Sequence, residues 1–173
     1  MQSLKNNLYG SFEEVPESLF FQKSGNGWSL AENIQHMNRV TRALALFFLT
    51  PKVLASVIFG KATNVRPMSE VAIIYLDALS KGQNAGLFVP VTENLNEKIE
   101  ERKKELLIEW NRRWDKYYGA LEKWDEAQLD GILMPHPFLG KIPAKEMYMI
   151  GILHPVHHSE IISKRLGRSW KYF

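Results

Sequence analysis

The chain has 173 residues and a formal net charge of +3, with 45% hydrophobic and 24% charged residues. This length predicts one domain over residues 1–173, and the composition is typical of a folded globular protein rather than a disordered one. Cysteine is absent, which excludes disulfides, thiolate metal sites and cysteine nucleophiles. The basic residues are mixed with acidic ones, as in residues 100–105, which indicates a solvated helix face and no nucleic-acid partner.

No targeting or membrane-spanning segment stands out in the sequence. The N-terminal stretch MQSLKNNLYG lacks the apolar core of a signal peptide. The longest apolar stretch, residues 44–60, is interrupted by Pro51 and Lys52 and is too short to span a bilayer. We therefore expect a soluble, cytoplasmic protein with no membrane partner.

The beginning of the chain predicts two helices. The first lies within roughly the first dozen residues and is followed by a connection over residues 16–28. Ser29 and Glu32 form the pattern of a capping box, in which each side chain bonds a backbone amide at the start of a helix. Trp28, just before the cap, can pack as a hydrophobic staple. We expect this second helix to run to about Thr50, where a proline follows.

The rest of the chain predicts further helices and little strand. The predicted segments are a helical stretch from Pro67 to near Gly82, a loop over 82–92, a long helix over about 93–121 and a last helix from near Pro143 to Gly167. The single strand candidate, residues 87–91, contains Pro90, which strands tolerate poorly. The pattern therefore predicts an all-α fold, an antiparallel four-helix bundle.

Three of the five histidines lie close together near the end of the chain. His154 and His158 are four residues apart, so on a helix they lie on one face, one turn above the other. His157 is rotated off that line by roughly 60°. Two histidines in an apolar stripe need partners for their ring nitrogens, and one metal ion would satisfy both. The other residues of this stripe are Met147, Ile150 and Ile161.

His36 is the candidate for a third ligand from a different helix. It shares a helical face with Val40, Ala43 and Phe47, whereas Asn38, Arg39 and Arg42 lie on the opposite side. Three protein nitrogens leave a fourth coordination position for water or substrate, as in a catalytic site rather than a closed structural one. Imidazole ligands suit zinc, nickel, copper or ferrous iron, so the residues alone leave the ion open.

The same histidines are also compatible with a protein that binds no metal. A single histidine pair of this spacing arises by chance or on a surface, and a lone His36 would be an ordinary core or surface residue. Pro155 lies between the two late histidines and removes an amide donor from the helix. Either the helix kinks there, with Gly151 offering slack, or a separate helix begins with Pro155 in its first turn.

Three sequence blocks together resemble the DinB-like superfamily, also described as DinB/YfiT-like metal-dependent hydrolases. The blocks are residues 28–36 (WSLAENIQH), 136–142 (HPFLGKI) and 154–161 (HPVHHSEI). The resemblance implies a four-helix bundle with a three-histidine site formed here by His36, His154 and His158, with zinc or nickel as the usual ion. The resemblance also implies a homodimer. Some relatives transfer small thiols such as bacillithiol or mycothiol, which makes the same reaction an expectation for this chain. Pro155 departs from the family pattern.

The leading hypothesis is a metal-dependent enzyme, either a small-thiol S-transferase or a hydrolase. The ion would lower the pKa of a bound thiol or water. His157 is the candidate for a supporting or proton-transfer residue, or else a solvated surface histidine. Glu146 either orients a histidine or lies on the surface. His136 either lines the mouth of the pocket or stabilises a turn.

The alternative is a dimeric helical-bundle stress or interaction protein with a vestigial metal site. Its partner surface would be the broken apolar stretch 44–59. Four aromatic residues spaced along the long helix predict core packing, with one or two of them as possible pocket walls. These are Trp110, Trp114, Tyr117 and Tyr118.

Overall fold

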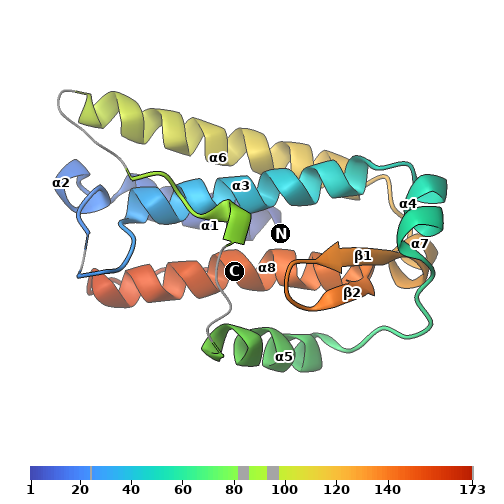
Figure 1. The fold of residues 1–173 in the computed structure, drawn as a ribbon. Helices are drawn as coiled ribbons and strands as arrows, with labels where there is room; N and C mark the ends of the chain where they lie inside the picture. Colours follow the sequence, from blue (N-terminus) through green and yellow to red (C-terminus); the bar gives the residue numbers. More distant parts are fainter. Residues whose placement is uncertain (24, 82–85, 93–97, 173) are drawn as a thin grey trace.

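The computed structural model describes residues 1–23, 25–81, 86–92 and 98–172 and is mostly helical (Figure 1). The α-helices of these residues are α1 (Gln2–Glu13), α2 (Glu17–Phe20), α3 (Leu30–Leu49), α4 (Lys52–Phe59), α5 (Met68–Ser80), α6 (Ile99–Leu121), α7 (Glu126–Gly131) and α8 (Ala144–Arg165). A 3₁₀ turn, η1 (Gly86–Phe88), precedes α6, and the strands β1 (Leu133–His136) and β2 (Gly140–Pro143) form an antiparallel hairpin before α8.

The long helices run in two pairs of opposite direction. Trp124, just after α6, donates its Nε1–H to the carbonyl of Phe48 at 2.7 Å, so α3 and α6 end side by side and run parallel. The Tyr118 hydroxyl donates to the carbonyl of Met1 at 2.6 Å, and Arg165 donates to the carbonyl of Trp28 at 2.7 Å. Both contacts join the beginning of one helix to the end of another, so α1 and α8 run opposite to α3 and α6 (Figure 1).

This arrangement differs from a simple up-and-down bundle, in which consecutive helices alternate in direction. Antiparallel neighbours are joined by short loops, whereas α3 and α6 are separated by residues 50–98, which include α4 and α5. That long connection allows the chain to return to the same end of the molecule before α6 begins.

The capping box at the start of α3 is present as predicted. The Ser29 hydroxyl accepts from the Glu32 amide at 3.1 Å, and the Glu32 carboxylate accepts from the Ser29 amide at 2.9 Å. α3 is buried on two sides, because it packs against both α6 and α8. The expectation that Asn38 lies on the outer side was therefore wrong: it is buried and donates to the carbonyl of Leu106 at 3.3 Å.

α8 continues through Pro155 as one helix, so the alternative of a separate helix that begins with Pro155 in its first turn was wrong. The helix ends at Arg165, two residues before the predicted stop at Gly167, whose φ of +64° is left-handed and whose amide bonds the Lys164 carbonyl. The next amide, of Arg168, bonds the Ser163 carbonyl, which completes a Schellman cap.

The two strands of the described residues lie outside segment 87–91, which the sequence offered as a strand candidate. Leu87 and Phe88 belong to η1, whereas the hairpin at residues 133–143 was not predicted. Its two short strands each contain a proline, and they are held by tertiary contacts: Leu133 donates to the Gly60 carbonyl at 3.0 Å. Such contacts leave no periodic signal in the sequence.

Several helix boundaries also differ from the predictions. The connection 16–28 contains α2, and α4 and α7 were not predicted. The boundaries expected near Gly82 and at about residue 93 fall outside the described residues; α5 ends at Ser80 and α6 begins at Ile99. Within the described residues, no single helix has the length and hydropathy of a membrane span. α3 and α4 reach them only when taken together, and this pair is bent by 103°.

Candidate metal centre

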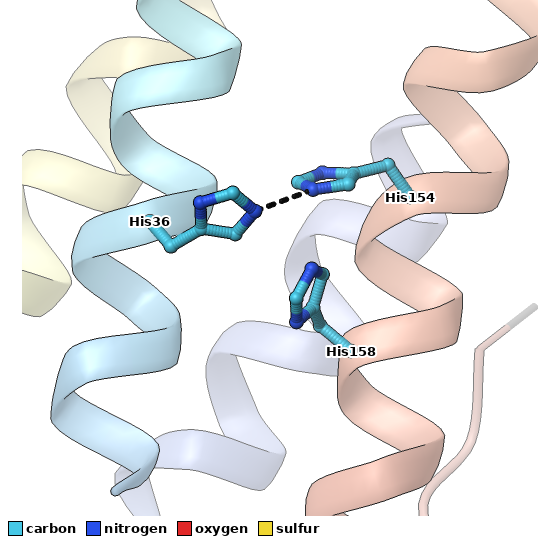
Figure 2. A group of neighbouring side chains, drawn as sticks. All are labelled: His36, His154 and His158. Atoms are coloured by element: carbon cyan, nitrogen blue, oxygen red, sulfur yellow. Dashed lines mark hydrogen bonds between the residues drawn. The ribbon is translucent and has the colours of Figure 1, made fainter. Parts of the chain in front are cut away.

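His36 from α3 converges with His154 and His158 from α8 (Figure 2). One ring nitrogen of each residue lies within 4.8 Å of the others, and Nε2 of His36 is 2.8 Å from Nε2 of His154. The ring centroids are 4.6 to 4.9 Å apart. The structure therefore brings together the three histidines that the sequence singled out.

Two of these imidazoles are oriented by hydrogen bonds at Nδ1, on the side of the ring away from the cluster. His36 Nδ1 lies 3.0 Å from the carbonyl oxygen of Phe88, which can only accept, so Nδ1 carries the proton. His158 Nδ1 lies 2.9 Å from Oδ1 of Asn33. The Asn33 amide nitrogen donates to the carbonyls of Trp28 and Ser29 at 3.2 and 2.8 Å, which leaves its oxygen for His158. In both neutral rings the lone pair is therefore on Nε2, the atom turned toward the cluster.

Trp28 covers the cluster from the start of α3. Its ring lies 5.1 Å from that of His36 and stacks on that of His158 at 6.3 Å with an interplanar angle of 8°. The capping box that follows fixes the direction in which α3 begins. Trp28 thus packs against both proposed ligand helices, a larger role than the predicted staple.

Burial keeps all three imidazoles neutral. It lowers the pKa of His36, and it holds the pKa values of His154 and His158 well below their usual range. The neighbouring imidazoles add to this effect, because a second positive charge beside the first is unfavourable. A neutral imidazole is the form that binds a metal ion.

The donor set fits a divalent transition metal. Lone pairs on Nε2 of His36 and His158 face a common space with the Nε2 of His154, and each of the two rings has the Nδ1 partner typical of metal-binding histidines. Among the described residues no carboxylate joins the cluster. An all-imidazole set suits zinc, nickel, copper or ferrous iron rather than magnesium or calcium.

The cluster opens on a cavity of about 430 Å³. This volume lies within the range of small-molecule sites. Its walls are apolar and aromatic side chains together with histidines: Trp28, His36, Val40, Ala43, Leu44, Phe47, Tyr75, Leu79, Phe88, Pro135, His136, Pro137, Phe138, Met147, Ile150, Gly151, His154, His157 and His158.

The remaining candidates from the sequence have different positions. His157 is half-buried and lines the cavity, and burial lowers its pKa. His136 also lines the cavity and at the same time stabilises a turn, so both roles considered for it are present. Ile161, expected in the inward stripe, is exposed, because the stripe passes out of the core at the end of α8.

Glu146 neither orients a histidine nor lies on the surface, so both expectations for it were wrong. Its side chain is 1% exposed and accepts from the guanidinium and the backbone amide of Arg66. A buried carboxylate needs such a partner, because an unpaired charge in the interior is strongly unfavourable. Glu146 therefore holds the segment before α5 against α8.

Three of the four aromatic residues of α6 are core residues, as expected, and Tyr118 is partly buried against the core, but none of the four lines the cavity. Trp110, Trp114 and Tyr117 are at most 1% exposed. The aromatic walls come from other elements and were missed: Phe47 and Phe88, and Tyr75 with Phe138. Asn33 was also missed, although its position three residues before His36 places it on the same side of α3.

The fold and the cluster define a mostly helical protein with two buried imidazoles and one partly buried imidazole that together can hold one metal ion. A family model described as the DinB superfamily matches residues 4–162. The chain therefore belongs to the DinB superfamily. No curated protein and no solved structure matches it.

Proposed function

We propose that the protein is a divalent-metal-dependent enzyme, with His36, His154 and His158 as ligands and zinc or nickel as the ion. One observation carries the proposal: three neutral imidazoles from two helices converge at the wall of a cavity large enough for a substrate. The proposal takes α1, α3, α6 and α8 as the four-helix bundle typical of the family.

When bound, the ion supplies a Lewis acid that lowers the pKa of a thiol or of water. The favoured reaction is transfer of a small thiol to an electrophile, with hydrolysis as the other possibility. Since the chain has no cysteine, the sulfur comes from the substrate.

The chain's own residues position and shield the reactants. Phe88 and Asn33 hold the imidazoles of His36 and His158 in one tautomer, and Trp28 covers them. The apolar walls exclude water. His157 lines the cavity with a neutral ring, and we propose that it accepts the proton of the attacking thiol or water and returns it to the leaving group.

The test is a conjugation assay on the full chain loaded with zinc or nickel. A panel of small thiols is offered with a fluorogenic alkylating agent such as monochlorobimane, and ester hydrolysis is measured in parallel. We expect metal-dependent turnover that H154A abolishes and H157N reduces by about 10²-fold or more. No turnover with metal bound would count against the enzyme.

An exposed apolar surface favours a second candidate, a dimeric interaction protein. Side chains on the second half of α3 and on α4 are 41% to 80% exposed: Leu46, Leu49, Val53, Leu54, Val57 and Ile58. Such a surface typically marks a contact with another protein, and a second copy of this chain is the proposed partner. Sedimentation of wild type and of a V53E/V57E variant tests it: a dimer that the variant dissociates supports the contact, and a monomeric wild type contradicts it.

A further inference from the structure

The walls of the cavity carry no formal charge. Among the described residues that line it, none is Asp, Glu, Lys or Arg. Burial raises the pKa of Tyr75 and lowers that of His136 to about 4, so both of these groups are neutral at physiological pH. A charged ligand would lose its hydration here without gaining an ionic partner from the protein walls.

His136 is the polar group of a wall that contributes no proposed metal ligand. It is the last residue of β1, and its ring lies 4.4 Å from that of Phe138 and 6.3 Å from that of Tyr75, edge-on to both. The hairpin and the two aromatic rings hold the imidazole in place at the cavity.

The turn between β1 and β2 determines which nitrogen of His136 carries the proton. Nδ1 accepts from the backbone amides of Phe138 and Leu139 at 3.5 and 3.3 Å. An imidazole nitrogen that accepts is unprotonated, so in the neutral ring the proton is on Nε2. Burial lowers the pKa of His136 to about 4, so this neutral form persists at physiological pH.

The Nε2–H group of His136 has no hydrogen-bond acceptor among the described residues. A polar donor at an apolar wall is what gives orientation to a ligand in small-molecule sites. We propose that the cavity binds an uncharged, largely apolar molecule carrying one hydrogen-bond acceptor, and that Nε2–H of His136 donates to that acceptor. Aromatic ketones and neutral esters belong to this class.

This inference concerns binding and goes beyond the proposed reaction, because it requires no metal. The test uses three probes of nearly equal size: acetophenone, which has a carbonyl acceptor; cumene, in which a methyl group replaces the carbonyl oxygen; and benzoate, which is charged. Dissociation constants for the full chain are measured by ligand-observed NMR in the presence of EDTA. The measurements are repeated with zinc, because a metal ion can itself hold a carbonyl oxygen.

Two variants of His136 distinguish the loss of the Nε2–H donor from a disruption of the turn that Nδ1 stabilises. H136N keeps an acceptor near the position of Nδ1, so the two backbone amides stay bonded, but it removes the distal donor. H136Q places an amide N–H near the position of Nε2. The readout is the ratio of acetophenone affinity to cumene affinity, because a general change in packing affects both probes alike.

In chelated protein we expect H136N to lower this ratio about two- to ten-fold, the worth of one neutral hydrogen bond, and H136Q to retain most of it. Benzoate should bind chelated protein at least about ten-fold more weakly than acetophenone. An unchanged ratio in H136N would overturn the inference, as would equal binding of benzoate or no binding of acetophenone.

A measurement on the wild type covers the case in which a variant fails to fold. In ¹⁵N-labelled protein, the ring of His136 should show the Nε2-protonated tautomer, and its Nε2 resonance should shift with acetophenone but not with cumene. The Nδ1 tautomer, or equal shifts with both probes, would refute the donor role. Because these results come from metal-free protein, failure of the metal site would leave them unaffected.

Discussion

Asn33 is the residue that connects the start of α3 to the proposed metal ligands. Its amide nitrogen is held by the carbonyls of Trp28 and Ser29, and its oxygen accepts from Nδ1 of His158 at 2.9 Å. This bond fixes both the orientation and the tautomer of a ligand ring. Residues that hydrogen-bond to a metal ligand contribute strongly to metal affinity, although they do not contact the ion themselves.

N33A should therefore weaken metal binding without removing the site. We expect the dissociation constant for zinc to rise about 10- to 100-fold, measured by competition with a chromophoric chelator. N38A is the matched control, because Asn38 is also buried on α3 but donates to the carbonyl of Leu106. Equal losses of affinity in the two variants would mean that Asn33 acts only through stability.

Spacing singled out His154 and His158, because residues four apart on a helix share a face, and the apolar face of the earlier helix added His36. The residues that line the cavity could not be identified by the same reasoning. Phe88 contributes through its backbone carbonyl, which any residue type would provide, and Tyr75 and Phe138 meet only after the hairpin docks against α5. Contacts of this kind depend on tertiary structure and have no pattern in the local sequence.

At the scale of elements, Gly151 is a point of close approach between α8 and its neighbours. A Cβ atom there would lie 2.7 Å from the hydroxyl oxygen of Tyr117 on α6 and 3.3 Å from Cδ1 of Leu44 on α3. Glycine at this position therefore lets α8 pack close to both helices. The position is one turn before His154, so it also sets the separation of the proposed ligands.

G151A should destabilise the protein by about 1–3 kcal/mol, because the added methyl group overpacks the interface. Urea unfolding measures this loss. The Tyr117 hydroxyl has no hydrogen-bond partner among the described residues, so Y117F alone should change stability little, and the double variant G151A/Y117F should recover part of the loss. Additive effects in this cycle would contradict the proposed contact.

The predictable elements were those with local signals. The capping box marked the start of α3, Gly167 marked the end of α8, and the spacing of aromatic residues marked α6. The short helices and the hairpin carry no comparable signal, and they are held by contacts with distant segments, such as that between Leu133 and Gly60. The parallel direction of α3 and α6 likewise depends on how the long connection folds.

At the scale of the whole molecule, all five histidines resist protonation in the folded state, since burial lowers the pKa of each. For His136 the folded pKa is about 4, below the ordinary value of 6.5 that the unfolded chain retains. The unfolded state therefore binds more protons between these two values. Stability is retained in full above the higher value and declines as the pH falls toward the lower one.

The free energy of unfolding of metal-free protein should thus decrease as the pH falls from about 7 to about 5. His136 alone should account for about 1–3 kcal/mol of the full decrease. H136N cannot protonate in this range, so its stability should depend less steeply on pH in the same urea titrations. Identical slopes for wild type and variant would show that His136 titrates normally in the folded protein.

The central claim is that His36, His154 and His158 bind one metal ion together. The most direct measurement is the metal content of the full chain after zinc or nickel supplementation and dialysis, compared with H36A, H154A and H158A, and with H157A as the control on the same helix. We expect about one ion per chain in wild type and H157A and marked loss in each of the other three. A metal-free wild type, or variants that retain the ion, would contradict the account.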